Sequence, residues 1–276
     1  MPGLLTPADV RRLLAEHGLA PHKALGQNFV VDPNTVRKVV RAAEVRPGDL
    51  VVEVGAGLGS LTIALRAAEA RVIAVEVDAG MVRALGDVVG TDPGVTVLHA
   101  DALAIDFAAL TCGQPAALVA NLPYNVATPI VMTALVSGAF GDLLVMVQKE
   151  VGQRWAARVG DPLYAGVSVK VAALAEACLA GSVSRNAFYP VPNVDSVLVR
   201  LRAKAQPETG ERQSLFEVVD TGFRQRRKRL RNALASPQHP PASIEAALRT
   251  AGLDTGARAE ELDLEGFVAL TSALRP

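Results

Sequence analysis

Apolar residues gather in short runs from residue 50 onward, and stretches with the spacing of one helix face separate them. Runs with the length and composition of buried strands occur at residues 50–54, 71–75, 95–98, 117–120 and 143–147. The segments 60–68 and 79–89 are predicted helices. Strands that alternate with helices favour an α/β fold with a parallel sheet and right-handed crossovers.

The pattern changes toward the C-terminus. Residues 194–202 alternate apolar and polar side chains, which predicts an edge or antiparallel strand. Residues 205–212 are polar and include Pro207 and Gly210, so we interpret them as a linker. Helical spacing follows at 214–234, 242–251 and 260–274. The sequence therefore predicts a larger domain over residues 1–204 and a small helical domain over residues 205–276.

Composition and cysteine usage agree with a folded protein of the cytoplasm. Half of the 276 residues are hydrophobic and only 4% are aromatic, so Ala, Val and Leu must fill the core. Cys112 and Cys178 lack metal-ligand spacing; we interpret them as buried thiols in a reducing cytoplasm and predict no metal site. Residues 1–20 lack the apolar region of a signal peptide, and no apolar run approaches the ~18 residues of a membrane span. We expect a soluble, cytoplasmic protein.

Three glycines follow the first predicted strand, Gly55, Gly57 and Gly59, with Glu53 just before them. Glycines let the backbone turn tightly and approach a ligand closely. A dinucleotide-binding fingerprint would place its third glycine at position 60, which is Ser60. The compressed spacing favours a ligand without a pyrophosphate.

Acids end the next two strands. Glu76 stands 21 residues after Gly55, where an acid typically accepts hydrogen bonds from ribose hydroxyls. Asp101 follows the third strand, where its carboxylate can reach an adenine amine. Because the carboxyl ends of parallel strands meet at one sheet edge, these acids and the glycines predict a cofactor site.

The tetrapeptide Asn121-Leu122-Pro123-Tyr124 follows the fourth predicted strand. A purine amine is a poor nucleophile because its lone pair is delocalised into the ring. The side-chain oxygen of Asn121 and the carbonyl of Leu122 can accept hydrogen bonds from such an amine. Pro123 restricts the backbone, and Tyr124 can stack on the base. These residues predict a catalytic site that accelerates the reaction mainly by positioning.

The formal net charge is zero, but the charges are unevenly distributed. The net charge is +3 over residues 1–46, −7 over 47–148, +7 over 149–231 and −3 over 232–276. Residues 224–231 hold six cations and no acid: Arg224, Arg226, Arg227, Lys228, Arg229 and Arg231. On one helix these cations would repel unless a polyanion neutralised them, whereas a solvated helix face usually intersperses acids. This cationic run favours contact with a nucleic-acid backbone.

Together, these motifs resemble the ribosomal RNA adenine N6-dimethyltransferase family, and specifically its small-subunit branch. The similarity also covers residues 23–29, 147–151, 188–196 and 223–232. It implies a Rossmann-like class I methyltransferase sheet that binds S-adenosylmethionine. It also implies that Asn121 and Tyr124 belong to the catalytic motif and that Phe188 covers the other face of a flipped adenine. The residues implied to contact the methyl donor are Asn28, Val30, Gly55, Glu76, Asp101 and Asn121.

The resemblance implies dimethylation of adjacent adenines in small-subunit (16S) ribosomal RNA during ribosome biogenesis. The expected partner is that RNA in the small subunit or its precursor, and the protein is expected to be a monomer. A large-subunit enzyme of the macrolide-resistance type is one alternative. A DNA adenine methyltransferase is another, although those enzymes share Asn/Asp-Pro-Pro-Tyr and here Leu122 occupies the second position. A third is an assembly factor that acts by binding.

Overall fold

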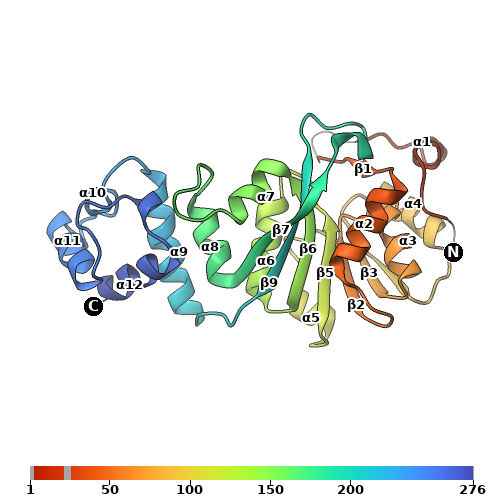
Figure 1. The fold of residues 1–276 in the computed structure, drawn as a ribbon. Helices are drawn as coiled ribbons and strands as arrows, with labels where there is room; N and C mark the ends of the chain where they lie inside the picture. The colour runs from red at the N-terminus through yellow and green to blue at the C-terminus, as the bar shows by residue number, and fades with distance from the viewer. Residues whose placement is uncertain (1–2, 22–25, 276) are drawn as a thin grey trace. The chain divides into compact units, whose positions relative to one another are not determined.

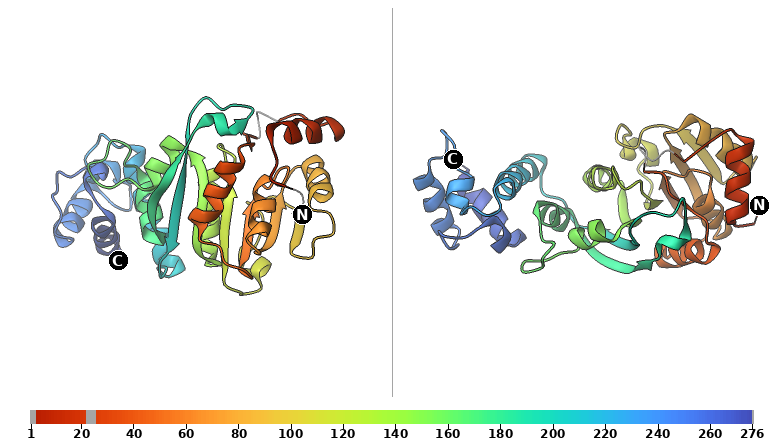
Figure 2. Two further views of the ribbon diagram at one scale, coloured as in Figure 1. Left: turned by 45° about the vertical axis from the view of Figure 1, so that its right-hand side comes forward. Right: turned by 90° about the horizontal axis from the view of Figure 1, so that it is seen from above.

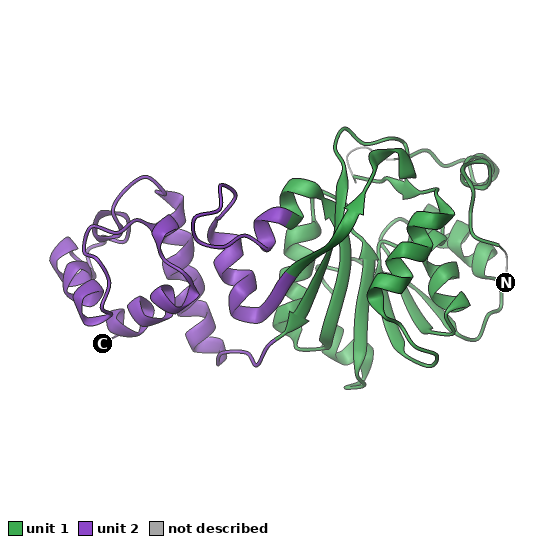
Figure 3. Ribbon diagram, viewed as in Figure 1, with its two compact units in different colours: residues 1–152, 178–203 green, residues 153–177, 204–276 purple. Residues whose placement is uncertain are grey.

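The computed structural model describes residues 3–21 and 26–275. The chain forms two compact units, one of residues 1–152 and 178–203 and the other of residues 153–177 and 204–276 (Figure 3). The segment 153–177 belongs to the second unit because Tyr164, Val169 and Ala173 join its core. The predicted division into domains 1–204 and 205–276 stays a prediction.

A seven-stranded sheet with the order β4-β3-β2-β5-β6-β9-β7 organises the chain (Figure 1). The five predicted strands are confirmed and pair in parallel: β2 Leu50–Val54, β3 Arg71–Glu76, β4 Val95–His99, β5 Ala116–Asn121 and β6 Phe140–Gln148. Strand β9, Ser196–Ala203, runs antiparallel to β6, as its alternating pattern predicts. The edge strand β7, Ala175–Val183, was not predicted from the sequence.

Helices cover both faces of the sheet, and α2 and α6 lie on opposite faces (Figure 2). Asp32 and Asp78 cap two of the helices by accepting hydrogen bonds from main-chain N–H groups that lack a partner within the helix. Apolar side chains on alternate strand positions, such as Val51, Val72 and Leu144, form one core with the buried faces of α2, α3 and α4. The helices of this unit are α1 Pro7–Glu16, α2 Pro33–Ala43, α3 Ser60–Ala67, α4 Ala79–Val89, α5 Phe107–Thr111, α6 Ala127–Ser137 and the first part of α7 Lys149–Trp155, whose residues from 153 onward belong to the second unit.

A second, two-stranded sheet links the segment before α2 to the segment before β9. Strand β1, Phe29–Val30, pairs antiparallel with β8, Phe188–Tyr189, which follows the 3-10 turn η2 at Arg185–Ala187. Phe29 lies opposite Tyr189, and Val30 lies opposite Phe188. This pairing ties two segments far apart in sequence to the same side of the first unit.

The second unit is helical, with a core around Phe267, Leu248 and Tyr164. The phenol of Tyr164 donates a hydrogen bond to the main-chain oxygen of Leu262 (2.7 Å). Its elements are α8 Gly166–Leu174, α9 Thr209–Arg224, α10 Leu230–Ala233, α11 Pro241–Thr250, η3 Ala259–Glu261 and α12 Leu264–Leu274.

The predicted continuous helix at 214–234 is wrong, because the chain leaves the helix at Gln225 and re-enters it at Leu230. The Leu230 side chain is fully buried, and its N–H donates to the main-chain oxygen of Ala257 (2.8 Å). The break therefore places Leu230 in the core and leaves the cations before it exposed on a turn.

The prediction that both cysteines are buried is also wrong, because both are exposed. Cys112 lies just after α5 in a left-handed conformation, and Cys178 lies on the edge strand β7. In the described part of the chain, no helix is both long and apolar enough to cross a membrane, and no cluster of three or more potential metal ligands occurs.

Two helical glycines provide a matched test of packing in the first unit. A Cβ on Gly152 in α7 would lie 2.4 Å from Val197 and 2.7 Å from Val199, whereas a Cβ on Gly86 in α4 would meet nothing within 4 Å. We expect Gly152→Ala to lower the free energy of unfolding by about 1–3 kcal/mol through overpacking. Gly86→Ala should raise it by about 0.4–1 kcal/mol. Urea unfolding of both variants measures the difference, and equal stabilities would contradict the tight contact of α7.

Candidate active site

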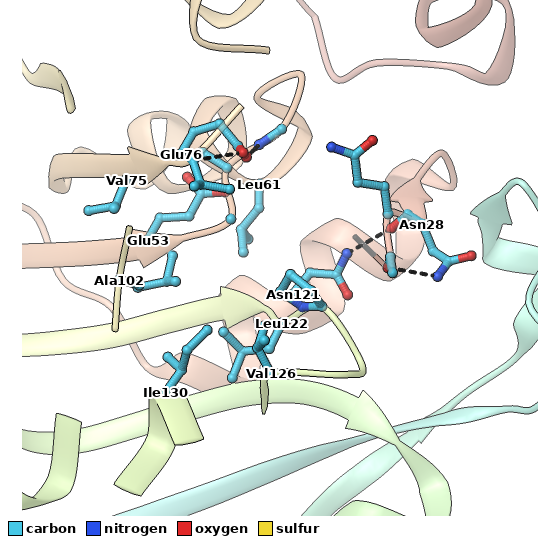
Figure 4. A pocket seen from close by; sticks show the side chains of 18 of the residues that line it. Asn28, Glu53, Leu61, Val75, Glu76, Ala102, Asn121, Leu122, Val126 and Ile130 are labelled. Carbon is cyan, nitrogen blue, oxygen red and sulfur yellow. Dashed lines mark hydrogen bonds between the residues drawn. The ribbon is translucent and has the colours of Figure 1, made fainter. Parts of the chain in front are cut away.

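A pocket of about 240 Å³ lies in the first unit at the carboxyl ends of β2, β3 and β5 (Figure 4). The segment before β1 contributes Gly26 and Asn28 to the wall, and β1 itself contributes Val30. The predicted cofactor and catalytic residues line it together, with the exception of Phe188: Asn28, Val30, Gly55, Gly57, Glu76, Asp101, Asn121, Leu122, Pro123 and Tyr124. Of the predicted motif 23–29, residues 23–25 lie outside the described residues.

The loop after β2 uses glycine at two positions where its backbone lies close to Phe29 and Pro123. Gly55 and Gly57 have φ angles of 73° and 54°, a region that favours glycine. A Cβ on Gly57 would lie 3.1 Å from the ring of Phe29, and one on Gly55 would lie 3.4 Å from Pro123. The loop therefore presents bare backbone to a ligand.

Glu76 organises this loop from the end of β3. Its carboxylate is buried and accepts hydrogen bonds from the N–H groups of Gly57 (2.8 Å), Val77 (2.9 Å) and Asp78 (2.9 Å). An ionised carboxylate has about four acceptor positions, so these bonds leave capacity for a ligand hydroxyl. Glu76 thus shapes the pocket as well as lining it.

Glu53, which precedes the glycines, is a buried acid on the floor of the pocket. Burial raises the pKa of its carboxyl to about 8, and the negative charge of Glu76 adds to the shift. The Thr62 hydroxyl donates a hydrogen bond to Glu53 (2.6 Å), and this bond opposes the rise in the pKa. With no ligand bound, Glu53 is therefore mostly protonated at neutral pH. The sequence indicates an acid at this position but not its burial.

Asp101 follows β4 and accepts a hydrogen bond from the N–H of Leu103 (2.9 Å). The side chains of Val77 and Leu103 also line the pocket and are 51% and 42% exposed. These apolar surfaces next to a carboxylate suit a flat ring with an exocyclic amine. Neither residue is predicted from the sequence, because single apolar residues after strands carry no distinctive signal.

The charge of the pocket distinguishes between ligand classes. Among the described residues that line it, Glu53, Glu76 and Asp101 are acidic, and none is Lys, Arg or His. Because Glu53 is mostly protonated, Glu76 and Asp101 supply the negative charge, which repels a phosphate-bearing ligand and stabilises a cationic one. The pocket therefore fits a positively charged nucleoside better than a nucleotide.

Asn121 is oriented by a hydrogen bond across the pocket. Its side-chain nitrogen donates to the main-chain oxygen of Asn28 (2.9 Å), and the side-chain nitrogen of Asn28 donates to the main-chain oxygen of Gly26 (3.0 Å) (Figure 4). Because the amide nitrogen is engaged, the Asn121 oxygen is the atom available to accept a bond from a ligand.

The rest of the tetrapeptide is held by contacts on both sides. The Leu122 side chain is buried, and its N–H donates to the main-chain oxygen of Met146 (3.1 Å). The Tyr124 phenol shares a hydrogen bond with the Ser196 hydroxyl, with 2.9 Å between the oxygens. Burial, with the charge of Asp195, raises the pKa of Tyr124, while the bond to Ser196 opposes the rise. The phenol therefore stays neutral at physiological pH.

Phe188 does not line the pocket. Its side chain is 2% exposed and packs in the core with residues of β6 and β9, such as Leu144 and Leu198. The neighbouring Tyr189 lies opposite Phe29, which does line the pocket. The predicted role of Phe188 over an adenine stays a prediction.

The predicted RNA-binding cations lie on the turn between α9 and α10, at the end of α9 and within α10. Arg226 pairs with Glu260, and Arg231 pairs with Glu245 (3.5 Å), so tertiary structure supplies acids that the run itself lacks. Within residues 3–21 and 26–275, no ion pair involves the remaining cations, which are exposed: Arg224, Arg227, Lys228 and Arg229.

Comparison with known proteins decides the family. The family model described as ribosomal RNA adenine dimethylase matches residues 18–275. A relative named ribosomal RNA small subunit methyltransferase A, from Thermobifida fusca, is 52% identical over 274 residues, which cover 97% of this chain and 95% of the relative. The protein of the same name from Streptomyces griseus is 48% identical, with 97% and 94% covered. The chain belongs to the ribosomal RNA adenine dimethylase family.

Solved structures agree with this family assignment. The 23S rRNA methyltransferase ErmE has a TM-score of 0.67 and 28% identity, covering 90% of this chain and 99% of its own. A dimethyladenosine transferase from Plasmodium falciparum has a TM-score of 0.67 at 22% identity, covering 88% and 95%, and shows the shared fold. The predicted Rossmann-like methyltransferase fold is confirmed.

The raised pKa of Glu53 predicts a pH-dependent stability. Below its ordinary pKa of 4.5 the carboxyl is protonated in folded and unfolded chains, and between 4.5 and about 8 only the unfolded chain ionises. The ligand-free protein should therefore lose stability as pH rises through this window, by up to about 1.4 kcal/mol per pH unit. Glu53→Gln should lack this loss, which urea unfolding between pH 5 and 9 measures. Parallel pH profiles for the two proteins would contradict the burial of a protonated Glu53.

Proposed function

We propose that this chain transfers two methyl groups from S-adenosylmethionine to the N6 amine of adjacent adenines in small-subunit ribosomal RNA, during ribosome biogenesis. Membership of the family makes it an S-adenosylmethionine-dependent rRNA adenine dimethyltransferase. The single observation that carries the site assignment is the orientation of Asn121, whose amide nitrogen is held by Asn28. Relatives named as small-subunit enzymes at 47–52% identity support the subunit.

The pocket fits S-adenosylmethionine on three observations. The glycine loop has a left-handed backbone and little room for a Cβ at Gly57, the lining is acidic, and Val77 and Leu103 present exposed apolar surface beside Asp101. We assign Glu76 to accept hydrogen bonds from the ribose and Asp101 to accept one from the adenine amine. When bound, the cofactor supplies an electrophilic methyl group on a sulfonium, which is a good leaving group.

Asn121 and Leu122 act on the target amine. The Asn121 oxygen and the Leu122 carbonyl accept hydrogen bonds from it, which favours a pyramidal nitrogen with its lone pair directed at the methyl carbon. Within the described residues, none donates a hydrogen bond to the Leu122 carbonyl. These acceptors are fixed before the base arrives, so they need no reorganisation during reaction.

Tyr124 supplies the stacking surface, and Pro123 restricts the turn that carries it. Stacking of a base on an aromatic ring contributes about 1–3 kcal/mol, which offsets part of the energy of taking the adenine out of its helix. Because the leaving group is good, the site works without a strong general base. None of the described residues that line the pocket is a histidine or lysine.

RNA docking is assigned to the cationic run. The exposed cations at 224 and 227–229 can neutralise phosphates, while Arg226 and Arg231 already face acids. We further propose that the protein acts as a monomer in the cytoplasm. The large-subunit alternative rests on the structural similarity to ErmE, but at 28% identity this is the weaker match. The effect of Asn121→Ala on methylation, described next, distinguishes catalysis from a role in assembly through binding alone.

Asn121→Ala should lower turnover without weakening S-adenosylmethionine binding to a similar extent, because the lost bond strengthens as the amine pyramidalises. A singly methylated amine offers one N–H, so the second transfer should be more sensitive to a weakened acceptor. We expect monomethyladenosine to accumulate with a partially active Asn121 variant. Mass spectrometry of digested RNA measures the products. Dimethyladenosine made at the normal rate by Asn121→Ala would refute the assignment.

Replacing Arg227, Lys228 and Arg229 with Gln should reduce the slope of log affinity against log salt for RNA by up to about 0.9 per lost phosphate contact on a duplex. Arg226→Gln should change the slope less, because Arg226 already pairs with Glu260. Filter binding at several salt concentrations measures the slope, and calorimetry should show unchanged S-adenosylmethionine affinity. An unchanged slope for the triple variant would mean that the run is only a solvated surface.

A further inference from the structure

Tyr124 is fixed at its outer end by a residue to which the chemistry above gives no role. Its phenol oxygen lies 2.9 Å from the hydroxyl oxygen of Ser196, and the Ser196 side chain is completely buried. A buried hydroxyl without a hydrogen bond is unfavourable, so this contact is a strong restraint on both side chains.

The sheet topology explains how residues 72 positions apart meet. Parallel strands end at the pocket edge, so only an antiparallel strand can start there, and β9 starts with Ser196. Ser196 pairs with Gln148, the last residue of β6. The preceding residue, Asp195, is anchored twice: its carboxylate accepts from the N–H of Arg185 (2.9 Å), and its main-chain oxygen accepts from the N–H of Lys149 (3.0 Å).

We propose that Ser196 is a positioning residue of the target-base site, whose hydroxyl holds the Tyr124 ring in the orientation that stacks on the adenine. The proposal rests on the function proposed above. Ser196 lies behind Tyr124, is not a residue of the pocket lining, and touches no reacting atom. Its contribution is to remove the rotational freedom of the ring before the base enters, so that this freedom is not lost during binding.

The activity of Tyr124→Phe distinguishes the positioning role proposed for Ser196 from simple stacking on the Tyr124 ring. If the ring serves only as a surface, Tyr124→Phe keeps nearly full activity, because the stacking area is almost unchanged. If the hydroxyl pair sets the ring orientation, Tyr124→Phe and loss of the Ser196 hydroxyl have the same effect. The two changes together then lower activity no further than either one alone, because both remove one interaction.

Ser196→Thr and Ser196→Val form a matched pair, since both add bulk to the strand and only Thr keeps a hydroxyl. On unmethylated small ribosomal subunits, we expect the single-turnover rate at saturating S-adenosylmethionine to be about two- to tenfold lower for Val than for Thr, the range expected of one neutral hydrogen bond. S-Adenosylmethionine affinity should be the same for both. Tyr124→Phe should show a similar loss, and Tyr124→Phe with Ser196→Val no larger one.

Equal rates for the Thr and Val variants, or full activity of Tyr124→Phe, would overturn the proposal. Losses that multiply in the double variant would also overturn it, because they would show two independent effects. If both Ser196 variants fold poorly in urea unfolding, Tyr124→Phe decides alone, since it leaves β9 intact. A wild-type protein that makes no dimethyladenosine would instead refute the proposed function.

Discussion

The site depends on the parallel pairing of β2, β3 and β5, which brings three strand ends to one edge of the sheet. Each strand end is a point where the backbone leaves the sheet and its polar groups need new partners. Glu76 meets this need for the loop after β2 by accepting from Gly57, and it also accepts from two N–H groups after its own strand. The hydrogen bonds that shape the pocket are therefore the same ones that satisfy the backbone N–H groups just after β2 and β3.

In the function that we propose, charges of opposite sign on the two units bind the cofactor and the RNA. The pocket in the first unit is lined by the carboxylates of Glu76 and Asp101, which favour a cationic cofactor and disfavour phosphates. The second unit carries the exposed cations at 224 and 227–229, which favour phosphates. A chain with a net charge of zero can thus recognise a cationic donor and a polyanionic substrate, because the opposite charges are held on different elements.

The tetrapeptide that we propose as catalytic, residues 121–124, is oriented by hydrogen bonds that form without any ligand. Asn28 holds the nitrogen of Asn121 and so selects which amide atom faces the substrate. The hydroxyl pair of Tyr124 and Ser196 does the same for the orientation of an aromatic ring. Transfer from a sulfonium needs little acid–base chemistry, so prior orientation of acceptors and stacking surfaces is the main contribution that the protein can make.

The sequence by itself determined the parallel strands, the glycine loop and the residues that end the strands, because these depend on local apolar runs and on the backbone freedom of glycine. Only the tertiary structure decided features that depend on distant partners. Leu230 is drawn into the core and interrupts a predicted helix, and Glu260 neutralises Arg226 from 34 residues away. Phe188 is buried in the core, and both cysteines are exposed at the ends of regular structure or on a sheet edge. The contact between Tyr124 and Ser196 requires an antiparallel strand to begin where parallel strands end, a relation that only the folded sheet creates.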